Sequence, residues 1–203
     1  MEQAKQRAPL SIRPLSRLVS RRDYEDFACT FAGIEKAAAA LLSAPFGPLL
    51  HLTVAASSGR PLPADCLTLQ SLVRSLRSLG DPEQPLCVQD YRPLRFRVRA
   101  LVRRDPNYVA SRIEEQARAQ FSERFSFLSR KLGQPVMAAE VLSALQAVPG
   151  VLAVTLLALH YEGESPTLRS ELRPNLARID TDGARQPAEL LLADGGNLFL
   201  EVL

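Results

Sequence analysis

Length, composition and charge already restrict the class of this protein. The chain has 203 residues, of which 46% are hydrophobic and 23% charged, ordinary globular proportions that exclude disordered and collagen-like structure. A chain of this mass buries about 70% of its unfolded surface, which is enough for a core without disulfides or metal ions. The net charge of +3 is too weak to indicate a protein built around phosphate contacts. No apolar run reaches the roughly 18 residues of a membrane span, and no secretory leader opens the chain, so we expect assembly in the cytoplasm.

The first predicted domain, residues 20–90, follows a polar lead-in arm over residues 1–19. Ser20 and Asp23 have the spacing of a capping box, and apolar residues at helical spacing then predict a helix that ends at Gly33. The segment that follows this glycine is the ambiguous part of the domain.

Residues 34–42 contain four consecutive alanines, which favour a helix, but they lie between a glycine and a proline-rich turn, which favour a break. Both interpretations stay open from the residues alone. Residues 49–55 read as a short β-rich strand. Residues 67–79 predict a helix with leucines on one face and arginines on the other.

The second predicted domain, residues 91–163, opens on a strand with one basic face. Arg95, Arg97 and Arg99 alternate there with apolar residues, the period-two pattern of a half-buried strand. A long amphipathic helix over residues 109–128, a shorter helix and an apolar strand over residues 151–160 follow. Both domains therefore read as a small sheet with helices on one face, which predicts an α+β protein of two ferredoxin-like domains.

Residues 164–203 are predicted to form an extended segment and a C-terminal β-hairpin arm. Two leucine-rich runs flank Asp194-Gly-Gly-Asn197, where glycine can supply the positive φ of a hairpin turn. Both faces of the hairpin would be apolar. We therefore expect its apolar side chains to be buried either against the protein's own sheet or against the edge of a partner's sheet. The candidate interface leucines are Leu190, Leu192, Leu198 and Leu200.

The sequence lacks the residue patterns of common catalytic and metal sites. Its three cysteines have no CxxC spacing, and the two histidines each lie in an apolar run, where a core histidine is expected. It has no glycine-rich phosphate loop before a helix and no GxSxG motif. We therefore expect no enzyme activity, no catalytic or metal-binding residues and no cofactor.

The arginine row has two interpretations. A cationic strand face can follow a phosphate backbone, which would make this a nucleic-acid-binding domain. However, Phe96 lies on the opposite face, so no aromatic side chain is interleaved for base stacking. The alternative, which we favour, pairs Arg95, Arg97 and Arg99 with carboxylates of a neighbouring strand or another subunit. A small-molecule-sensing domain of ferredoxin-like build is a further alternative for the whole chain.

Several segments together resemble the baseplate J-like proteins, which are wedge components of contractile phage tails and of related contractile injection systems. The similarity lies in the order and spacing of the segments rather than in any single motif. The segments are residues 8–13, 17–28, 31–37, 91–100, 133–136, 139–141, 148–151 and 188–192. Family members are usually longer, with upstream domains, so the resemblance is to the carboxy-terminal part of the family.

The resemblance implies a structural role. Its carboxy-terminal domains would pair with another wedge subunit, and wedges would join into a ring around the hub and spike, with the sheath as a further partner. It implies a strand over residues 34–42 and carries no catalytic residue with it. We thus expect a non-enzymatic baseplate subunit whose interfaces change on firing, with no nucleic-acid partner and no membrane insertion. Arg95, Arg97, Arg99 and the four C-terminal leucines are its candidate interface residues.

Overall fold

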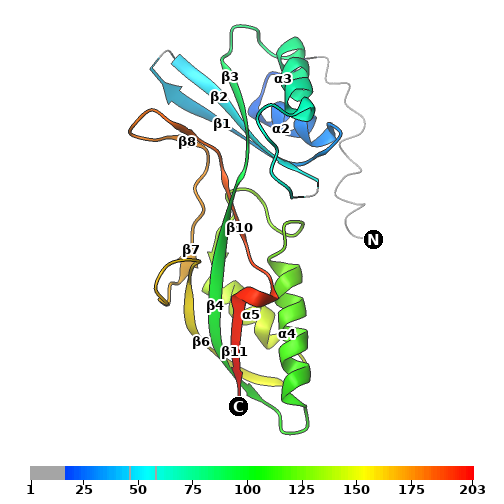
Figure 1. Ribbon diagram of the computed structural model, residues 1–203, viewed down its shortest axis with the longest axis vertical. Helices are drawn as coiled ribbons and strands as arrows, with labels where there is room; N and C mark the ends of the chain where they lie inside the picture. Colours follow the sequence, from blue (N-terminus) through cyan, green and yellow to red (C-terminus); the bar gives the residue numbers. More distant parts are fainter. Residues whose placement is uncertain (1–16, 46, 58) are drawn as a thin grey trace. The chain divides into compact units, whose positions relative to one another are not determined.

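The structure is a computed structural model that describes residues 17–45, 47–57 and 59–203 (Figure 1). Most of the predicted lead-in arm, residues 1–19, therefore lies outside the described residues. The chain forms two compact units: unit 1 comprises the chain up to Tyr91 together with Ala177–Ala188, and unit 2 comprises Arg92–Leu176 together with Glu189–Leu203. No helix in the described part of the chain is long and apolar enough to cross a membrane.

Both units contain helices and strands. In unit 1 they are α2 (Arg21–Thr30), β1 (Ile34–Ala44), β2 (Gly47–Ala56), α3 (Leu67–Leu79), β3 (Leu86–Asp90), β8 (Arg178–Ile179) and β9 (Arg185–Gln186). In unit 2 they are β4 (Arg92–Arg104), α4 (Ala110–Arg124), β5 (Val136–Met137), α5 (Ala138–Gln146), β6 (Val151–Tyr161), β7 (Glu171–Leu172), β10 (Glu189–Leu192), the 3-10 helix η2 (Gly195–Asn197) and β11 (Leu198–Val202).

The α2 helix begins with the predicted capping box. The Asp23 backbone N–H donates to the Ser20 hydroxyl oxygen at 3.2 Å, and the Ser20 backbone N–H donates to the Asp23 carboxylate at 2.7 Å. The helix ends before Gly33, whose φ of 92° suits glycine. This break lets the chain continue as β1, so the alanine run is a strand, as the family resemblance implies. Its pairing with β2 outweighs the helix preference of alanine.

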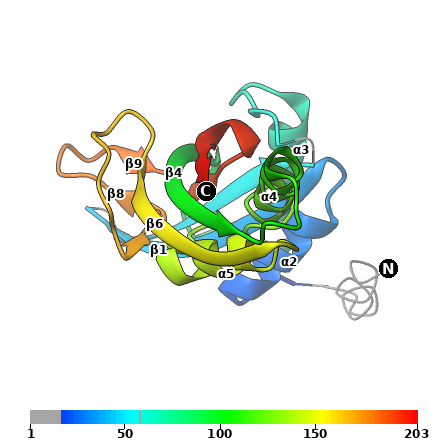
Figure 2. The ribbon, with the colours of Figure 1, turned by 90° about the horizontal axis from the view of Figure 1, so that it is seen from below.

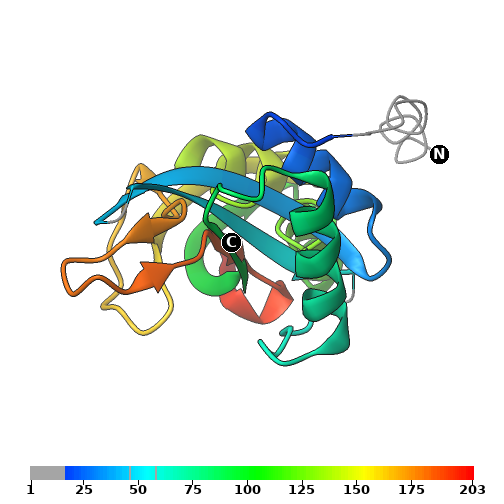
Figure 3. The same ribbon diagram turned by 90° about the horizontal axis from the view of Figure 1, so that it is seen from above.

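The unit 1 sheet has the order β1-β2-β3, with β1 antiparallel and β3 parallel to β2. Leu50, Leu52 and Val54 of β2 pack in one cluster with residues of α2 and α3, which therefore cover the same face (Figure 3). The other face of β2 is also buried, because the Ala188 backbone N–H donates to the Thr53 hydroxyl at 2.9 Å. Residues 177–188 thus complete unit 1.

The unit 2 core lies between β4, β6 and the two helices α4 and α5 (Figure 2). Phe96, Phe121 and Phe125 are fully buried, and their ring centroids lie 4.8 to 6.0 Å apart. Edge-to-face aromatic packing of this kind adds to the free energy gained by burial alone. β6 pairs antiparallel with β4.

The predicted C-terminal hairpin is wrong. β10 and β11 do not pair with each other; both run parallel to β4, at Arg92–Arg95 and Val98–Val102 respectively. Neither glycine between them has the positive φ that a two-residue hairpin turn needs. Instead, the Asp194 carboxylate accepts the Gly196 backbone N–H at 2.8 Å and caps η2, so the chain keeps its direction.

The α+β class is confirmed, since the described residues of each unit combine β-sheet with α-helices. Neither strand order confirms the finer ferredoxin-like prediction. Residues 177–188 belong to unit 1. The predicted boundaries, 20–90, 91–163 and 164–203, do not include this return of the chain to the first unit.

A candidate protein interface

The basic strand predicted from the sequence is β4, and its two faces differ as expected. Phe96, Val98, Ala100 and Val102 are buried against the helices, whereas the alternating arginines are exposed. We call the side of the unit 2 sheet turned away from α4 and α5 the outer face. It is formed by Arg95, Arg97, Arg99, Leu101 and Arg103 of β4 with Phe199 and Glu201 of β11.

Two arginines of the outer face have carboxylate partners within unit 2. Arg95 lies 3.0 Å from the Asp194 carboxylate, and Arg97 lies 2.8 Å from Glu162. The favoured interpretation of the arginine row places these carboxylates on a neighbouring strand or another subunit, whereas Asp194 and Glu162 lie just after the ends of β10 and β6. All four side chains are at least one-third exposed, so these ion pairs contribute little to stability.

Phe199 is the main apolar side chain of the outer face. It is 48% exposed, and the Arg97 guanidinium carbon lies 6.0 Å from the centroid of its ring. Beside it is a hollow of about 580 Å³. The residues that line it include Arg99, His160 and Glu201. Sequence reasoning missed Phe199 because it treated only the leucines of this segment as interface candidates.

The four candidate leucines do not lie together on the surface. Leu190 and Leu198 are fully buried, and Leu198 belongs to the core of unit 2. Leu192 and Leu200 are half-buried, and Leu200 packs against that core. Most of the apolar surface of these leucines is therefore buried within unit 2. The hypothesis that these residues form an interface stays a prediction.

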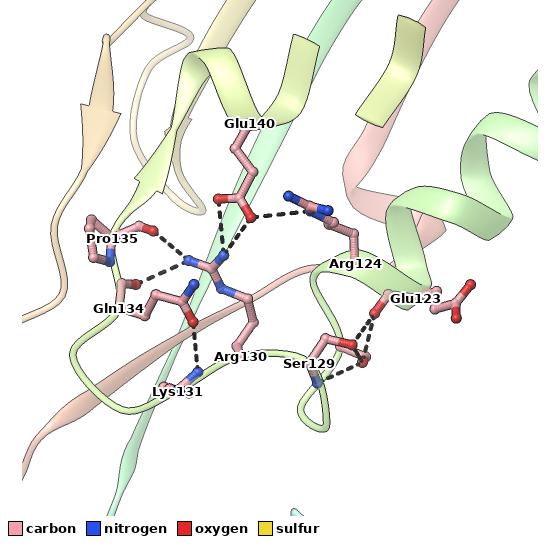
Figure 4. Close-up of polar contacts among 9 residues, drawn as sticks. Glu123, Arg124, Ser129, Arg130, Lys131, Gln134, Pro135 and Glu140 are labelled. Carbon is pink, nitrogen blue, oxygen red and sulfur yellow. Dashed lines mark hydrogen bonds and ion pairs between the residues drawn. The ribbon is translucent and has the colours of Figure 1, made fainter. Parts of the chain in front are cut away.

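A second polar cluster surrounds Arg130 in unit 2 (Figure 4). The Arg130 side chain is 1% exposed, and its guanidinium donates to both Glu140 carboxylate oxygens at 3.0 Å and to the Pro135 carbonyl. Arg124 also contacts Glu140, at 3.2 Å. Burial lowers the pKa of Arg130, and the Glu140 carboxylate opposes that shift. The cluster ties the loop after α4 to α5. Arg124 and Arg130 share the single Glu140 carboxylate, and the buried Nε of Arg130 has no hydrogen-bond partner among the described residues.

The sites of the two histidines were expected to be structural. His51 is fully buried, and its Nε2 lies 2.7 Å from the Gln89 side-chain oxygen. His51 is paired in register with Cys87. Burial on its own raises the pKa of the Cys87 thiol, but the nearby His51 and Arg185 side chains have the larger combined effect, so the pKa is lowered. The Nδ1 of His51 lies 3.4 Å from the Thr53 hydroxyl oxygen, so both ring nitrogens have polar neighbours within unit 1. His160 Nδ1 lies 2.9 Å from the Tyr161 carbonyl oxygen.

No group of three or more His, Cys, Asp or Glu side chains within the described ranges is placed to hold a metal ion.

Comparison with known proteins agrees with the resemblance seen in the sequence. Residues 16–89 match the family model of the Baseplate J-like central domain, which confirms the resemblance to baseplate J-like proteins over that range. The fold is similar to a chain in the six-fold symmetrised cryo-EM structure of the anti-feeding prophage baseplate, with a TM-score of 0.62 and 15% sequence identity. The similarity covers 95% of this chain and 42% of that chain. No curated protein matches the sequence.

Proposed function

We propose that this chain, whose residues 16–89 match the Baseplate J-like central domain, is a structural subunit of a contractile phage tail-like baseplate. The observation that carries the proposal is that a family match in unit 1 and a baseplate-like fold over 95% of the chain agree independently. In such a particle the subunit would take the wedge position and bind other wedge subunits, with the hub, spike or sheath as further partners. It would assemble in the cytoplasm and act as a non-enzymatic part of the particle.

The outer face of unit 2 is the surface that we assign to subunit contact. Arg95, Arg97 and Arg99 supply exposed donors there, and Phe199 supplies apolar area. An aromatic side chain beside arginine is the combination most enriched at the centre of protein interfaces. Leu190 and Leu198 would contribute indirectly, by holding β10 and β11 against β4.

The mechanism of such a subunit is mechanical. Packed interfaces have a small number of discrete arrangements rather than a continuous range, so a baseplate can hold one ring geometry before firing and another afterwards. Exposed arginine–carboxylate pairs suit this role, because they contribute little stability individually and can exchange partners at low cost.

Co-expression with baseplate subunits encoded beside this chain tests the proposal. We expect a stable complex on size-exclusion chromatography with light scattering, and ring- or wedge-shaped particles in negative-stain images. The chain expressed alone, mixed with an unrelated tail protein, is the control and should stay uncomplexed. If the chain remains a monomer beside its natural neighbours, the proposed function is wrong.

A further inference from the structure

The outer face of unit 2 carries positive charge that the described residues do not neutralise. Arg95 and Arg97 have carboxylate partners, but no described residue forms an ion pair or hydrogen bond with the side chain of Arg99 or Arg103. Both side chains are exposed. Leu101 lies between them on the same face of β4, half-buried.

We propose that the outer face binds an extended segment of another baseplate subunit. In that segment one apolar residue lies two positions from each of two acidic residues. The proposal rests on the proposed function and specifies the chemistry of the partner. The two carboxylates would pair with Arg99 and Arg103, and the apolar side chain would lie over Leu101.

The spacing of β4 supports this pattern. Alternate residues of a strand lie about 6.6–6.8 Å apart on one face, so Arg99, Leu101 and Arg103 present a cation, an apolar group and a cation at equal intervals. An extended partner segment has the same repeat. Acidic residues at positions i and i+4, with an apolar residue at i+2, therefore match all three side chains at once.

The hollow beside Phe199 extends the site. Phe199 is opposite Arg99 in register on β11, and the hollow of about 580 Å³ adjoins both side chains. A side chain of the partner that follows the acidic segment can bury the exposed part of the Phe199 ring.

The charges of the outer face favour a protein partner over a nucleic acid. Asp194 and Glu162 already neutralise Arg95 and Arg97, which leaves Arg99 and Arg103 for an acidic partner. A segment with two carboxylates matches those two positions, whereas a phosphate backbone carries a continuous row of charge that would also meet Asp194 and Glu162. The two arginines that have partners are both paired with carboxylates.

The test uses the full chain, a charge-reversal variant R99E/R103E and a matched control R74E/R77E. Arg74 and Arg77 are exposed on α3 of unit 1, so the control carries the same change in net charge away from the outer face. The probe is a short blocked peptide with the pattern Glu-Ser-Leu-Ser-Glu, titrated against isotope-labelled protein by NMR, with the same peptide carrying Lys in place of both Glu residues as its control.

We expect the acidic peptide to shift the amide signals of β4 and β11 and the basic peptide to leave them unchanged. Binding should weaken about tenfold or more in R99E/R103E and stay within about twofold in R74E/R77E. Equal binding to both double variants, or shifts outside β4 and β11, would overturn the inference. A short oligonucleotide that binds the chain more tightly, and loses that binding in R99E/R103E, would overturn it in favour of nucleic acid.

Co-expression separates this inference from the proposed function. If the chain and R99E/R103E both assemble equally well with neighbouring baseplate subunits, the proposed function stands and the inference fails. If the unaltered chain fails to assemble, the proposed function fails and the peptide titration decides the inference alone.

Discussion

Removal of the Glu140 side chain tests how unit 2 tolerates a buried charge. The Arg130 side chain is 1% exposed and Glu140 is 18% exposed, and two hydrogen bonds of 3.0 Å join them. In Glu140→Ala, the Arg130 guanidinium keeps its bonds to backbone carbonyls but loses its compensating charge. Breaking one side of a buried ion pair costs about 3–5 kcal/mol. Arg124, which also contacts Glu140, would leave a second cation nearby, so we expect the cost not to fall below about 3 kcal/mol.

Urea unfolding followed by circular dichroism measures this cost, and a double-mutant cycle isolates the pair. We expect Arg130→Met with Glu140→Ala to be less destabilised than the sum of the two single variants, by about 2 kcal/mol. The matched control is Glu164→Ala, which breaks the exposed pair with Arg169, whose side chains are 43% and 42% exposed. That variant should lose less than about 1 kcal/mol. If Glu140→Ala and Glu164→Ala lose the same stability, the argument from burial is refuted.

Three further predictions concern other parts of the chain. Ser20→Ala removes the side-chain cap of α2 and should lower the free energy of unfolding by about 1 kcal/mol, whereas Ser20→Gly should lose only a few tenths. Burial raises the pKa of Asp90 despite hydrogen bonds from the Leu62 and Tyr91 backbone N–H groups, so the unaltered chain loses stability as pH rises through that pKa. Asp90→Asn lacks this loss, so its stability relative to the unaltered chain should increase over the same pH range in urea titrations; a constant difference would contradict the assignment. Deletion of residues 189–203 removes β10 and β11 from β4, and we expect loss of the unit 2 tertiary signals in NMR spectra, while a native-like spectrum would contradict the topology.

Local patterns in the sequence predict most elements because local physics forms them. The capping box at Ser20 and Asp23 starts α2, and the period-two pattern of β4 places its arginines on one face. For residues 34–42 local signals conflict, because alanine favours a helix and the flanking turns favour a break. Pairing with β2 decides the conflict, and that pairing has no signal within the segment itself.

The same limit explains what sequence reasoning missed at the candidate site. The parallel pairing of β10 and β11 with β4 joins residues about a hundred positions apart, and nothing in the leucine runs distinguishes it from a local hairpin. Arg130 lies in a loop without periodicity, so its burial has no local signal either. The basic half of the outer face was therefore predictable, whereas Phe199 and the carboxylate of Asp194 become part of it only through the fold.

The outer face is assembled from two distant parts of unit 2, and this links its formation to folding of the whole chain. Arg97 comes from β4, but Phe199 beneath it comes from β11, which the chain reaches only after residues 177–188 have passed through unit 1. Asp194, the partner of Arg95, lies in the same C-terminal run. A chain in which that run has not docked on β4 still carries the arginines, but it lacks the aromatic side chain and one carboxylate. Such a chain would present a different charge pattern. A partner that contacts both the arginines and Phe199 would therefore bind more tightly to subunits in which β10 and β11 have paired with β4.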